Sequence, residues 1–369
     1  MAGLYIHIPF CKSRCIYCGF YSTTNKEWQQ RYVDAVCHEM QMRPSLETVT
    51  TIYLGGGTPS QLNSGQLRQL FDTIYKVYAP IPTEITIECN PDDISEEFCT
   101  LLKTLPVNRI SMGAQTFSDE RLRFLHRRHT AYQVPEAVKR LRDAGIHNIS
   151  IDLMYGFPNE TLVDWERDID TVLALQIEHI SAYCLMVEEG TVLSERLKMK
   201  DERLKMPDEE LERQMYELLI DKLTAAGYEH YEISNFARSG YRSQHNSSYW
   251  NDVTYIGLGA AAHSYVGRIR SWNVSDLQQY ITSIERDELP SEHELTDDDT
   301  HYNDRITTAL RTSDGLNLGE LTDKHRRYCL KEAQRFLADG LLTLHDQQLR
   351  LTRRGLFVSD YIMSSLMLV

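Results

Sequence analysis

The chain has 369 residues, of which 42% are hydrophobic and 25% are charged, and its net charge is -14. This length and composition are typical of a soluble globular protein with room for more than one domain. The acidic balance argues against a general nucleic-acid binder, which needs a basic surface to neutralise phosphates. No apolar run is long enough to cross a bilayer, and the first residues, MAGLYIHIPF, lack the features of a secretory signal. We therefore expect a cytoplasmic protein whose eight cysteines stay reduced.

From the N-terminus, predicted strands alternate with predicted helices. Strands are expected at 4–8, 51–57, 84–89, 109–115, 148–156 and 179–185. Helices are expected at 28–42, 64–79, 95–104, 161–176 and 208–227, with shorter helical stretches after residue 115. This alternation predicts an α/β fold with a parallel sheet covered by helices. An open sheet and a partial (β/α) barrel remain as alternatives, and in a barrel the chemistry lies at the C-terminal ends of the strands.

The pattern changes near residue 290. The acidic segment 287–300 is interpreted as a boundary, so we expect domains at 1–285 and 290–369. Beyond it, a helix ending at Gly340, a tight hairpin and a final helix resemble a small winged-helix module. Such modules often bind DNA, but no strong basic face is evident, and we favour a packing role. The apolar tail at 362–369 is too short to span a membrane and is expected to dock on the core, which leaves peripheral membrane contact open.

Three cysteines stand close together in the loop after the first predicted strand. Cys11, Cys15 and Cys18 have C-x3-C-x2-C spacing, which brings three thiolates around one metal centre. A structural zinc site usually has four protein ligands, and a zinc completed by a distant histidine is the alternative. Three thiolates around a four-iron cluster instead leave one iron open to bind and activate a ligand. Most of the other cysteines are expected to be buried as small hydrophobic side chains: Cys37, Cys89, Cys99, Cys184 and Cys329.

Glycines and polar residues follow several of the other predicted strands. The stretch LGGGTPS begins at a strand end, where glycines let the backbone approach a ligand closely, although a lone glycine run is more often a structural turn. Glu88, Gln115, Arg127 and Asp152 also lie at or beyond strand ends. Each of them taken alone is compatible with an ordinary cap or a solvated side chain, but all of them fall where a barrel places its chemistry.

The cysteine pattern, with Tyr17 directly before the third cysteine, resembles the radical S-adenosylmethionine (SAM) superfamily. The resemblance implies a [4Fe-4S] cluster on Cys11, Cys15 and Cys18, with SAM chelated to the open iron through its amino and carboxylate groups. An electron from the cluster would then cleave SAM to methionine and a 5′-deoxyadenosyl radical. The resemblance also implies a set of SAM-binding residues: Tyr5, Tyr17, Gly56, Gly57, Thr58, Glu88, Gln115, Arg127 and Asp152.

Two kinds of contact with SAM follow from this resemblance. Arg127 is suited to pair with the SAM carboxylate. Glu88 or Asp152 is suited to accept hydrogen bonds from the ribose hydroxyls or the amino group.

Further motifs resemble one branch of that superfamily, the oxygen-independent coproporphyrinogen III oxidases. YIHIPFC, GGGTPS, MGAQTF, DLMYGFP and the C-terminal module carry the resemblance over nearly the whole chain. The true oxidases of this branch have a C-x3-C-x2-C-x-C pattern and a longer N-terminal arm. A group of heme chaperones in the same branch has Phe two residues after the third cysteine and starts shortly before the motif. Phe20 occupies that position and ten residues precede Cys11, which favours the chaperone group.

The stretch HNSSYW agrees with this assignment. It is similar to an H-N-x-x-Y-W motif of the chaperone group, which implies heme binding by His245, Tyr249 and Trp250. Neutral imidazole can ligate heme iron, and aromatic rings can pack on a porphyrin face. A core histidine in a hydrogen-bonded loop is the alternative for His245, and His263 is a weaker candidate for the ligand. No C-x-x-C-H signature for covalent c-type heme is present.

Two functions from different classes therefore remain. The first is a heme chaperone that binds heme and transfers it to an acceptor protein; the sequence identifies neither this acceptor nor the electron donor. The second is a radical enzyme that oxidatively decarboxylates coproporphyrinogen III, and the SAM motifs leave SAM cleavage open in either case. Phe20, the short N-terminal segment and HNSSYW favour the chaperone. We expect a partial (β/α) barrel of the radical SAM type with a small C-terminal helical or winged-helix-like module, holding a [4Fe-4S] cluster, SAM and heme.

Overall fold

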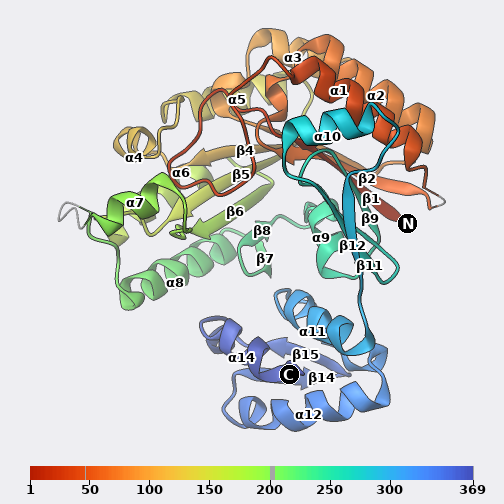
Figure 1. Ribbon diagram of the computed structural model, residues 1–369. Helices are drawn as coiled ribbons and strands as arrows, with labels where there is room; N and C mark the ends of the chain where they lie inside the picture. The colour runs from red at the N-terminus through yellow and green to blue at the C-terminus, as the bar shows by residue number, and fades with distance from the viewer. Residues whose placement is uncertain (46, 200–203, 369) are drawn as a thin grey trace.

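The computed structural model describes residues 1–45, 47–199 and 204–368, and a large sheet of mostly parallel strands forms its centre (Figure 1). The parallel strands follow one another in chain order: β1 (Ala2–Ile8), β2 (Val49–Gly56), β3 (Glu84–Cys89), β4 (Arg109–Gln115), β5 (Asn148–Tyr155) and β6 (His179–Cys184). Each of these strands was predicted from the sequence. They contain long runs of buried residues because helices cover one face of the sheet and side chains fill the other.

Helices connect these strands and cover the outer face of the sheet (Figure 1). They are α1 (Gln29–Met42), α2 (Ser64–Tyr78), α3 (Glu96–Leu102), α4 (Asp119–Phe124), α5 (Gln133–Asp143), α6 (Leu162–Ala174), α7 (Val192–Lys198) and α8 (Glu209–Ala225). Local sequence fixes where several of them begin. The Asn63 side chain accepts a hydrogen bond from the Gln66 backbone and the Gln66 side chain accepts one from the Asn63 backbone, which makes a capping box at the start of α2.

Further strands extend both edges of the sheet and leave it open. Next to β1 lie β9 (Tyr255–Leu258), which is parallel to it, and then β10 (His263–Val266), β11 (Ile269–Asn273) and β12 (Ser291–Leu295), which are antiparallel. Next to β6 lie β8 (Asn235–Ala237) and β7 (Glu229–Glu232). Two more helices, α9 (Gln244–Trp250) and α10 (Leu277–Ile284), belong to this region. The open, ordered sheet confirms the α/β fold class and the partial barrel.

The C-terminal module has its own sheet and its own hydrophobic core. Its elements are α11 (Asp298–Ala309), β13 (Leu316–Asn317), α12 (Asp323–Ala338), β14 (Leu342–His345), β15 (Gln348–Leu351), α13 (Arg353–Leu356) and α14 (Ser359–Leu366). The predicted tight hairpin is β14–β15, whose turn residues Asp346 and Gln347 both have positive φ angles. Tyr302, Phe336 and Ile362 lie in a core that is separate from that of the barrel.

The acidic segment at 287–300 is not a plain linker. Residues 291–295 form β12, which pairs with β11 and belongs to the large sheet, and α11 begins soon after at Asp298. The change from barrel to module therefore falls between β12 and α11, later than the break at 285–290 placed by composition. The reason is that β12 is an exposed edge strand, so it lacks the apolar pattern that would mark it as a strand.

Several ion pairs join the C-terminal module to the barrel. Arg311 pairs with Glu232 of β7 at 2.8 Å, and His301 of α11 lies 2.9 Å from Asp252. The Arg311 guanidinium also lies 5.2 Å from the centre of the Trp250 ring, at the end of α9. Phe357 adds an apolar contact, since it packs against the barrel core. The end of α9 is therefore fixed against the module.

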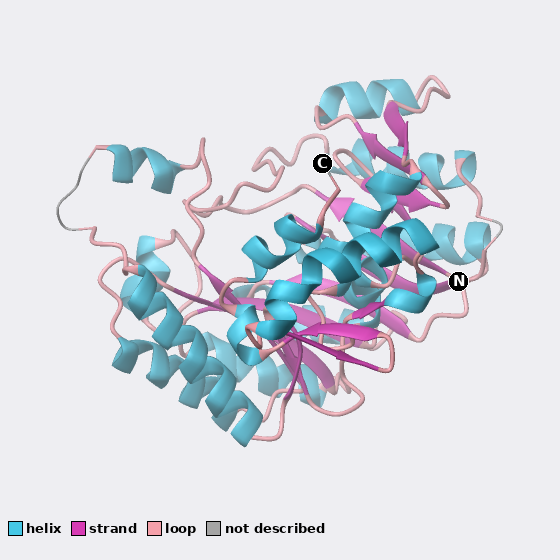
Figure 2. Cartoon of the chain, turned by 90° about the horizontal axis from the view of Figure 1, so that it is seen from below, coloured by secondary structure: helices cyan, strands magenta, loops and turns pink. Residues whose placement is uncertain are grey.

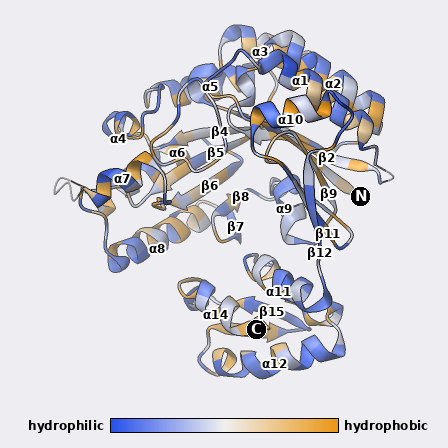
Figure 3. Ribbon diagram, viewed as in Figure 1, coloured by the Kyte–Doolittle hydropathy of each residue, from blue (hydrophilic) through white to orange (hydrophobic). Residues whose placement is uncertain are grey.

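Hydropathy follows this architecture. The central strands are coloured largely as hydrophobic and the outward faces of the helices as hydrophilic in Figure 3. The view from below in Figure 2 also places strands in the middle of the molecule and helices outside them. Within the part of the chain that the structure describes, no helix combines the length and apolar character needed to cross a membrane.

One buried carboxylate ties the edge strands to the barrel. Glu39 of α1 is fully buried and accepts hydrogen bonds from the Gly259 backbone at 2.8 Å, Asn273 at 2.8 Å and Tyr280 at 2.6 Å. It also pairs with Arg43 at 2.9 Å. These donors come from the β9 end, β11 and α10, so a single side chain connects four elements.

Replacing Glu39 with Ala should destabilise the chain by about 3 kcal/mol or more, because it leaves several buried donors without an acceptor. Urea unfolding measures this loss. Glu285→Ala is the matched control. Glu285 pairs with Arg31, which lies on α1 as Glu39 does, but the Arg31–Glu285 pair is exposed. Equal and small losses in both variants would contradict the role assigned to Glu39.

Candidate functional site

The cysteine motif lies in the loop that follows β1. Cys11, Cys15 and Cys18 are free, partly buried and line one cavity of about 150 Å³. Ile16, between the cysteines, anchors the loop in a small apolar cluster with Leu125 and Leu193, and exchanges backbone hydrogen bonds with both. The loop is thus attached to segments that follow β4 and β6.

Two polar side chains donate hydrogen bonds to the cysteine sulfurs. The Thr58 hydroxyl lies 3.6 Å from Cys11 Sγ, and Arg127 Nη1 lies 3.5 Å from Cys15 Sγ. Burial raises the pKa of the Cys11 and Cys18 thiols. Donors directed at sulfur suit thiolates better than thiols, because they stabilise the negative charge.

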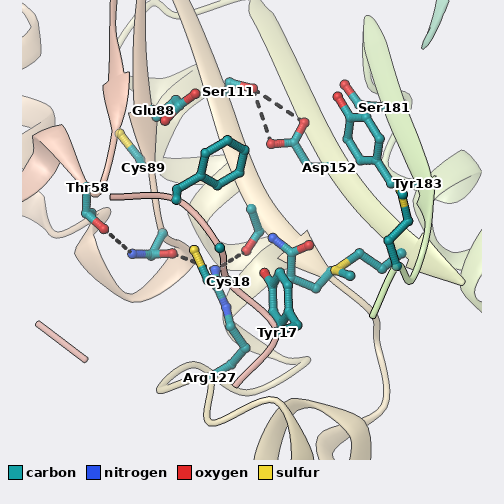
Figure 4. A pocket seen from close by; sticks show the side chains of 18 of the residues that line it. Tyr17, Cys18, Thr58, Glu88, Cys89, Ser111, Arg127, Asp152, Ser181 and Tyr183 are labelled. Atoms are coloured by element: carbon teal, nitrogen blue, oxygen red, sulfur yellow. Dashed lines mark hydrogen bonds between the residues drawn. The ribbon is translucent and has the colours of Figure 1, made fainter. Parts of the chain in front are cut away.

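A second cavity of about 440 Å³ adjoins the cysteine cavity (Figure 4). It lies at the C-terminal ends of the parallel strands, where a barrel places its chemistry. Many of the predicted site residues line it: Tyr17, Gly57, Thr58, Glu88, Gln115, Arg127 and Asp152. Tyr17, Cys18, Gly57, Thr58 and Arg127 line both cavities, which makes the two one connected site.

Glu88 and Asp152 are the partly buried carboxyl groups of the larger cavity, which the exposed Glu188 also lines. Glu88 accepts hydrogen bonds from the Tyr53 hydroxyl at 2.7 Å and the Gly56 backbone at 3.0 Å, and burial raises its pKa to about 7. Asp152 accepts from the Ser111 hydroxyl at 3.4 Å, and burial raises its pKa to about 6. Both carboxylates are therefore costly to ionise without a cationic ligand beside them.

Arg127 supplies positive charge where the two cavities meet. Besides Cys15, its guanidinium donates to the Asn90 side chain at 2.5 Å and to the Gly113 carbonyl. The Asn90 side-chain amide donates in turn to the Thr58 hydroxyl at 3.3 Å. Figure 4 shows Thr58 and Arg127 near Cys18. This arrangement gives a carboxylate ligand a cation next to the cysteine loop.

The glycine run is explained by close backbone contact. A Cβ atom on Gly57 would lie 2.7 Å from the Ile8 carbonyl oxygen and 2.8 Å from the Pro9 carbonyl carbon, so only glycine fits there. Its backbone donates a hydrogen bond to Ile8 at 2.8 Å. The neighbouring Gly56 lines the cysteine cavity. These contacts hold the end of β2 against the start of the cysteine loop.

Tyr5 lies apart from the other predicted SAM-binding residues. It lines neither of the two cavities, and its hydroxyl lies 3.1 Å from His7 Nδ1. The Tyr5 ring lies 6.1 Å from that of Tyr53. Its position six residues before Cys11 puts it well inside β1, so its side chain packs in the barrel interior in this conformation.

His245 lies in the barrel interior with both ring nitrogens hydrogen-bonded. Its exposed fraction is 1%, and its two ring nitrogens are engaged with Thr51 at 2.9 Å and Tyr249 at 2.8 Å. Burial lowers its pKa to about 3, so the ring is neutral. No ring nitrogen is left for an iron atom, and Trp250 lies under Arg311 of the module. Heme contact by His245, Tyr249 and Trp250 stays a prediction, and His263 is exposed on β10 beside Trp272.

Several residues that line the larger cavity were not predicted from the sequence. Asn90, Ser111, Ser181 and Tyr183 line the larger cavity and come from the ends or inner faces of β3, β4 and β6. Their signal was present as polar residues at every second position of otherwise apolar strands, which marks one face of a strand as polar. Cys184 is the exception among the cysteines expected to be buried, since it is partly exposed and lines this cavity.

Known proteins are similar to the chain over almost its whole length. The family model of the radical SAM superfamily matches residues 5–172, and that of the HemN C-terminal domain matches residues 296–358. The heme chaperone HemW of Bacillus subtilis (strain 168) is 38% identical over 339 residues, with 89% of this chain and 88% of the relative covered. The heme chaperone HemW of Lactococcus lactis is 32% identical over 99% of this chain and 97% of its own length. The chain belongs to the HemW family.

A solved structure supports the fold of this HemW-family chain. The structure titled "Coproporphyrinogen III oxidase (HemN) from Escherichia coli is a Radical SAM enzyme" superposes with a TM-score of 0.84. It covers 99% of this chain and 89% of its own, at 22% sequence identity. At that identity the similarity establishes the shared architecture alone.

Membership of the radical SAM superfamily implies a [4Fe-4S] cluster and SAM, and the residues present fit both groups. Three free thiols share a cavity, with Thr58 and Arg127 donating to sulfur, and the adjoining cavity offers a cation and the carboxylates of Glu88 and Asp152, with Glu188 also in its lining. Among the residues that the structure describes, no group of three or more Cys, His, Asp or Glu side chains is gathered closely enough to hold a metal ion.

Replacement of any one of Cys11, Cys15 or Cys18 with Ser should abolish the cluster absorbance of the reconstituted protein, because three thiolates are needed. Iron and sulfide analysis measures the same loss. Cys184→Ser is the matched control, since Cys184 lines the adjoining cavity outside the motif and should leave the iron content unchanged. Full iron and sulfide in a triple Cys-to-Ser variant would show that the cluster is held elsewhere.

Glu88→Gln should flatten the pH dependence of stability of the cofactor-free chain. Burial raises the folded-state pKa of Glu88 to about 7, above the unfolded value of about 4.3, so the folded chain keeps a proton that the unfolded chain loses. Its contribution is fully present below about pH 4.3 and is lost as the pH rises through 7, up to about 4 kcal/mol. Urea unfolding between pH 4 and 8 measures the difference between variant and parent. Glu97→Gln, at an exposed position on α3, should keep the parent profile; identical profiles for both variants would contradict the assignment.

Proposed function

We propose that this chain is a heme chaperone, which binds heme and passes it to an acceptor protein. The observation that carries the proposal is the similarity to proteins named heme chaperone HemW, at 32% to 38% identity over 89% to 99% of the chain. The residue types around the cysteine loop and the adjoining cavity support the accompanying cluster and SAM. The acceptor is a protein that lacks its heme, and the cluster requires an electron donor.

Cys11, Cys15 and Cys18 would hold the [4Fe-4S] cluster, which supplies an open iron and an electron when it is bound. Arg127 is placed to pair with the SAM carboxylate, because it lies where the two cavities meet. Glu88 and Asp152 are placed to accept hydrogen bonds from the SAM amino group or ribose hydroxyls. Gly56, Gly57, Thr58, Tyr17 and Gln115 would complete the SAM contacts.

Phe20 supports the chaperone over the oxidase. It takes the place of the fourth cysteine that the oxidase pattern would have, and its exposed fraction is 72%. The match to the relatives named heme chaperone HemW covers 88% and 97% of their own length, so the similarity is not limited to the shared barrel. Coproporphyrinogen III decarboxylation is the less favoured alternative.

The mouth of the larger cavity suits a porphyrin face. Phe20 and Met186 line it, and their exposed fractions are 72% and 73%. Exposed apolar side chains at the rim of a cavity often mark a ligand site, and a porphyrin is a broad apolar plane. We therefore place heme at this rim, with SAM deeper in the cavity. The free cysteines are consistent with transfer in the reducing cytoplasm.

An anaerobic heme titration of the cluster-reconstituted chain tests the proposal, with Soret absorbance for binding and transfer to an apo heme protein as the second readout. We expect saturable one-to-one binding and release to the acceptor. Phe20→Ala should weaken binding about tenfold, since it removes apolar contact worth about 1 to 2 kcal/mol. Tyr132→Ala is the matched control, because Tyr132 is equally exposed at 73% but does not line the cavity.

Weak, non-saturating binding without transfer would contradict the chaperone function. Incubation with coproporphyrinogen III, SAM and a reductant would then test the oxidase. Saturable binding that is equally strong in Phe20→Ala would keep the chaperone and exclude the cavity mouth as its heme site.

A further inference from the structure

The HNSSYW segment has a place in the structure that heme binding does not explain. It forms α9, whose first turn enters the barrel and whose last residue meets the C-terminal module. Asn246 lines the larger cavity directly next to the buried His245. The segment therefore reaches the site proposed for SAM through side chains other than an iron ligand.

His245 is stacked on the tyrosine that holds Glu88. The imidazole and the Tyr53 ring lie 5.1 Å apart with an interplanar angle of 25°. The Tyr53 hydroxyl in turn donates a 2.7 Å hydrogen bond to Glu88 Oε1, while the other carboxylate oxygen accepts from Gly56. A continuous contact thus runs from His245 through Tyr53 to a carboxylate that lines the cavity.

The His245 imidazole is also held by hydrogen bonds at both of its ring nitrogens. Thr51 Oγ1 lies 2.9 Å from one ring nitrogen and the Tyr249 hydroxyl lies 2.8 Å from the other. The buried Glu84 accepts hydrogen bonds from the backbone N–H groups of Gln244 and His245, at 2.9 Å and 3.0 Å. Since ring and backbone are both held, His245 offers Tyr53 a rigid surface.

The backbone leaves room for this contact at one glycine. A Cβ atom on Gly55 would lie 2.7 Å from Tyr53 Cε1 and 3.0 Å from the Glu88 carboxyl carbon. Any larger residue there would push the tyrosine and the carboxylate apart. The first glycine of the GGG run thus leaves space for the Tyr53–Glu88 pair.

We propose that His245 is a positioning residue for SAM binding, acting through the Tyr53 ring on Glu88, and is not a heme-iron ligand. This inference deepens the proposed function, since it assigns part of the HNSSYW segment to the SAM cavity. A carboxylate can favour one ligand orientation only if its own side chain is held, and the stack on His245 removes one direction in which Tyr53 could turn. Asn246 adds a polar group from the same helix to the cavity wall.

SAM binding to the cluster-reconstituted protein, measured by equilibrium dialysis, tests this role beside heme binding measured by Soret titration. His245→Ala should raise the dissociation constant for SAM about tenfold, because Tyr53 loses its support. His245→Phe keeps an aromatic face against Tyr53 but cannot ligate iron, and its SAM affinity should stay within about threefold of the parent. Heme affinity should change less than about threefold in both variants.

His179→Ala is the matched control for burial. His179 is fully buried in the same barrel with its ring nitrogens bonded to Ser150 at 2.8 Å and Tyr231 at 2.7 Å, but it is not stacked on Tyr53. It should lose stability as His245→Ala does, measured by thermal unfolding, yet keep SAM affinity. Tyr53→Phe supplies a coupling test: its loss of SAM affinity should not add to that of His245→Ala, since both act on Glu88.

Heme affinity that falls more than tenfold in both His245 variants, with SAM affinity unchanged, would make His245 the iron ligand and overturn the inference. Equal loss of SAM affinity in the Ala and Phe variants would also overturn it, because the stack would then not be the cause. If His245→Ala does not fold, the SAM affinities of His245→Phe and Tyr53→Phe decide whether the stack on Tyr53 supports SAM binding. Failure of all forms to bind heme would refute the chaperone function while the SAM measurements still test this role.

Discussion

The Arg127 guanidinium is the contact on which the rest of the site depends. It bonds to the sulfur of Cys15, the side chain of Asn90 and the carbonyl of Gly113, so it connects the cysteine loop to the ends of β3 and β4. The loop alone has no regular secondary structure to fix it. Because one cation serves both cavities, the thiols and the carboxylates keep a fixed relation to each other.

The polar interior of the barrel carries a cost in stability. Glu88 and Asp152 are partly buried with raised pKa values, so ionising them costs more in the barrel than in water. Such groups persist where a ligand of opposite charge compensates them, and SAM carries both a sulfonium and an ammonium. This cost in stability therefore falls at the cavity where the ligand is expected and not in the surrounding core.

Much of the fold was predictable because parallel strands carry continuous apolar runs. The six central strands and the cysteine loop followed from spacing and composition, as did Glu88, Gln115, Arg127 and Asp152 at strand ends. The exposed edge strand β12 was not recognised, since no hydrophobic pattern marks it. The hydrogen-bond partners of Tyr5 and His245 could not be predicted, because sequence gives a residue's type but not the neighbours that occupy its polar atoms.

The anchoring of Ile16 has a consequence for the local stability of the cysteine loop. The loop is fastened by a satellite cluster of six buried residues, separate from the main core. A segment held by few buried contacts opens locally at a lower free energy than the strands of a large core. The loop can therefore rearrange around a bulky inorganic group while the strands behind it stay folded.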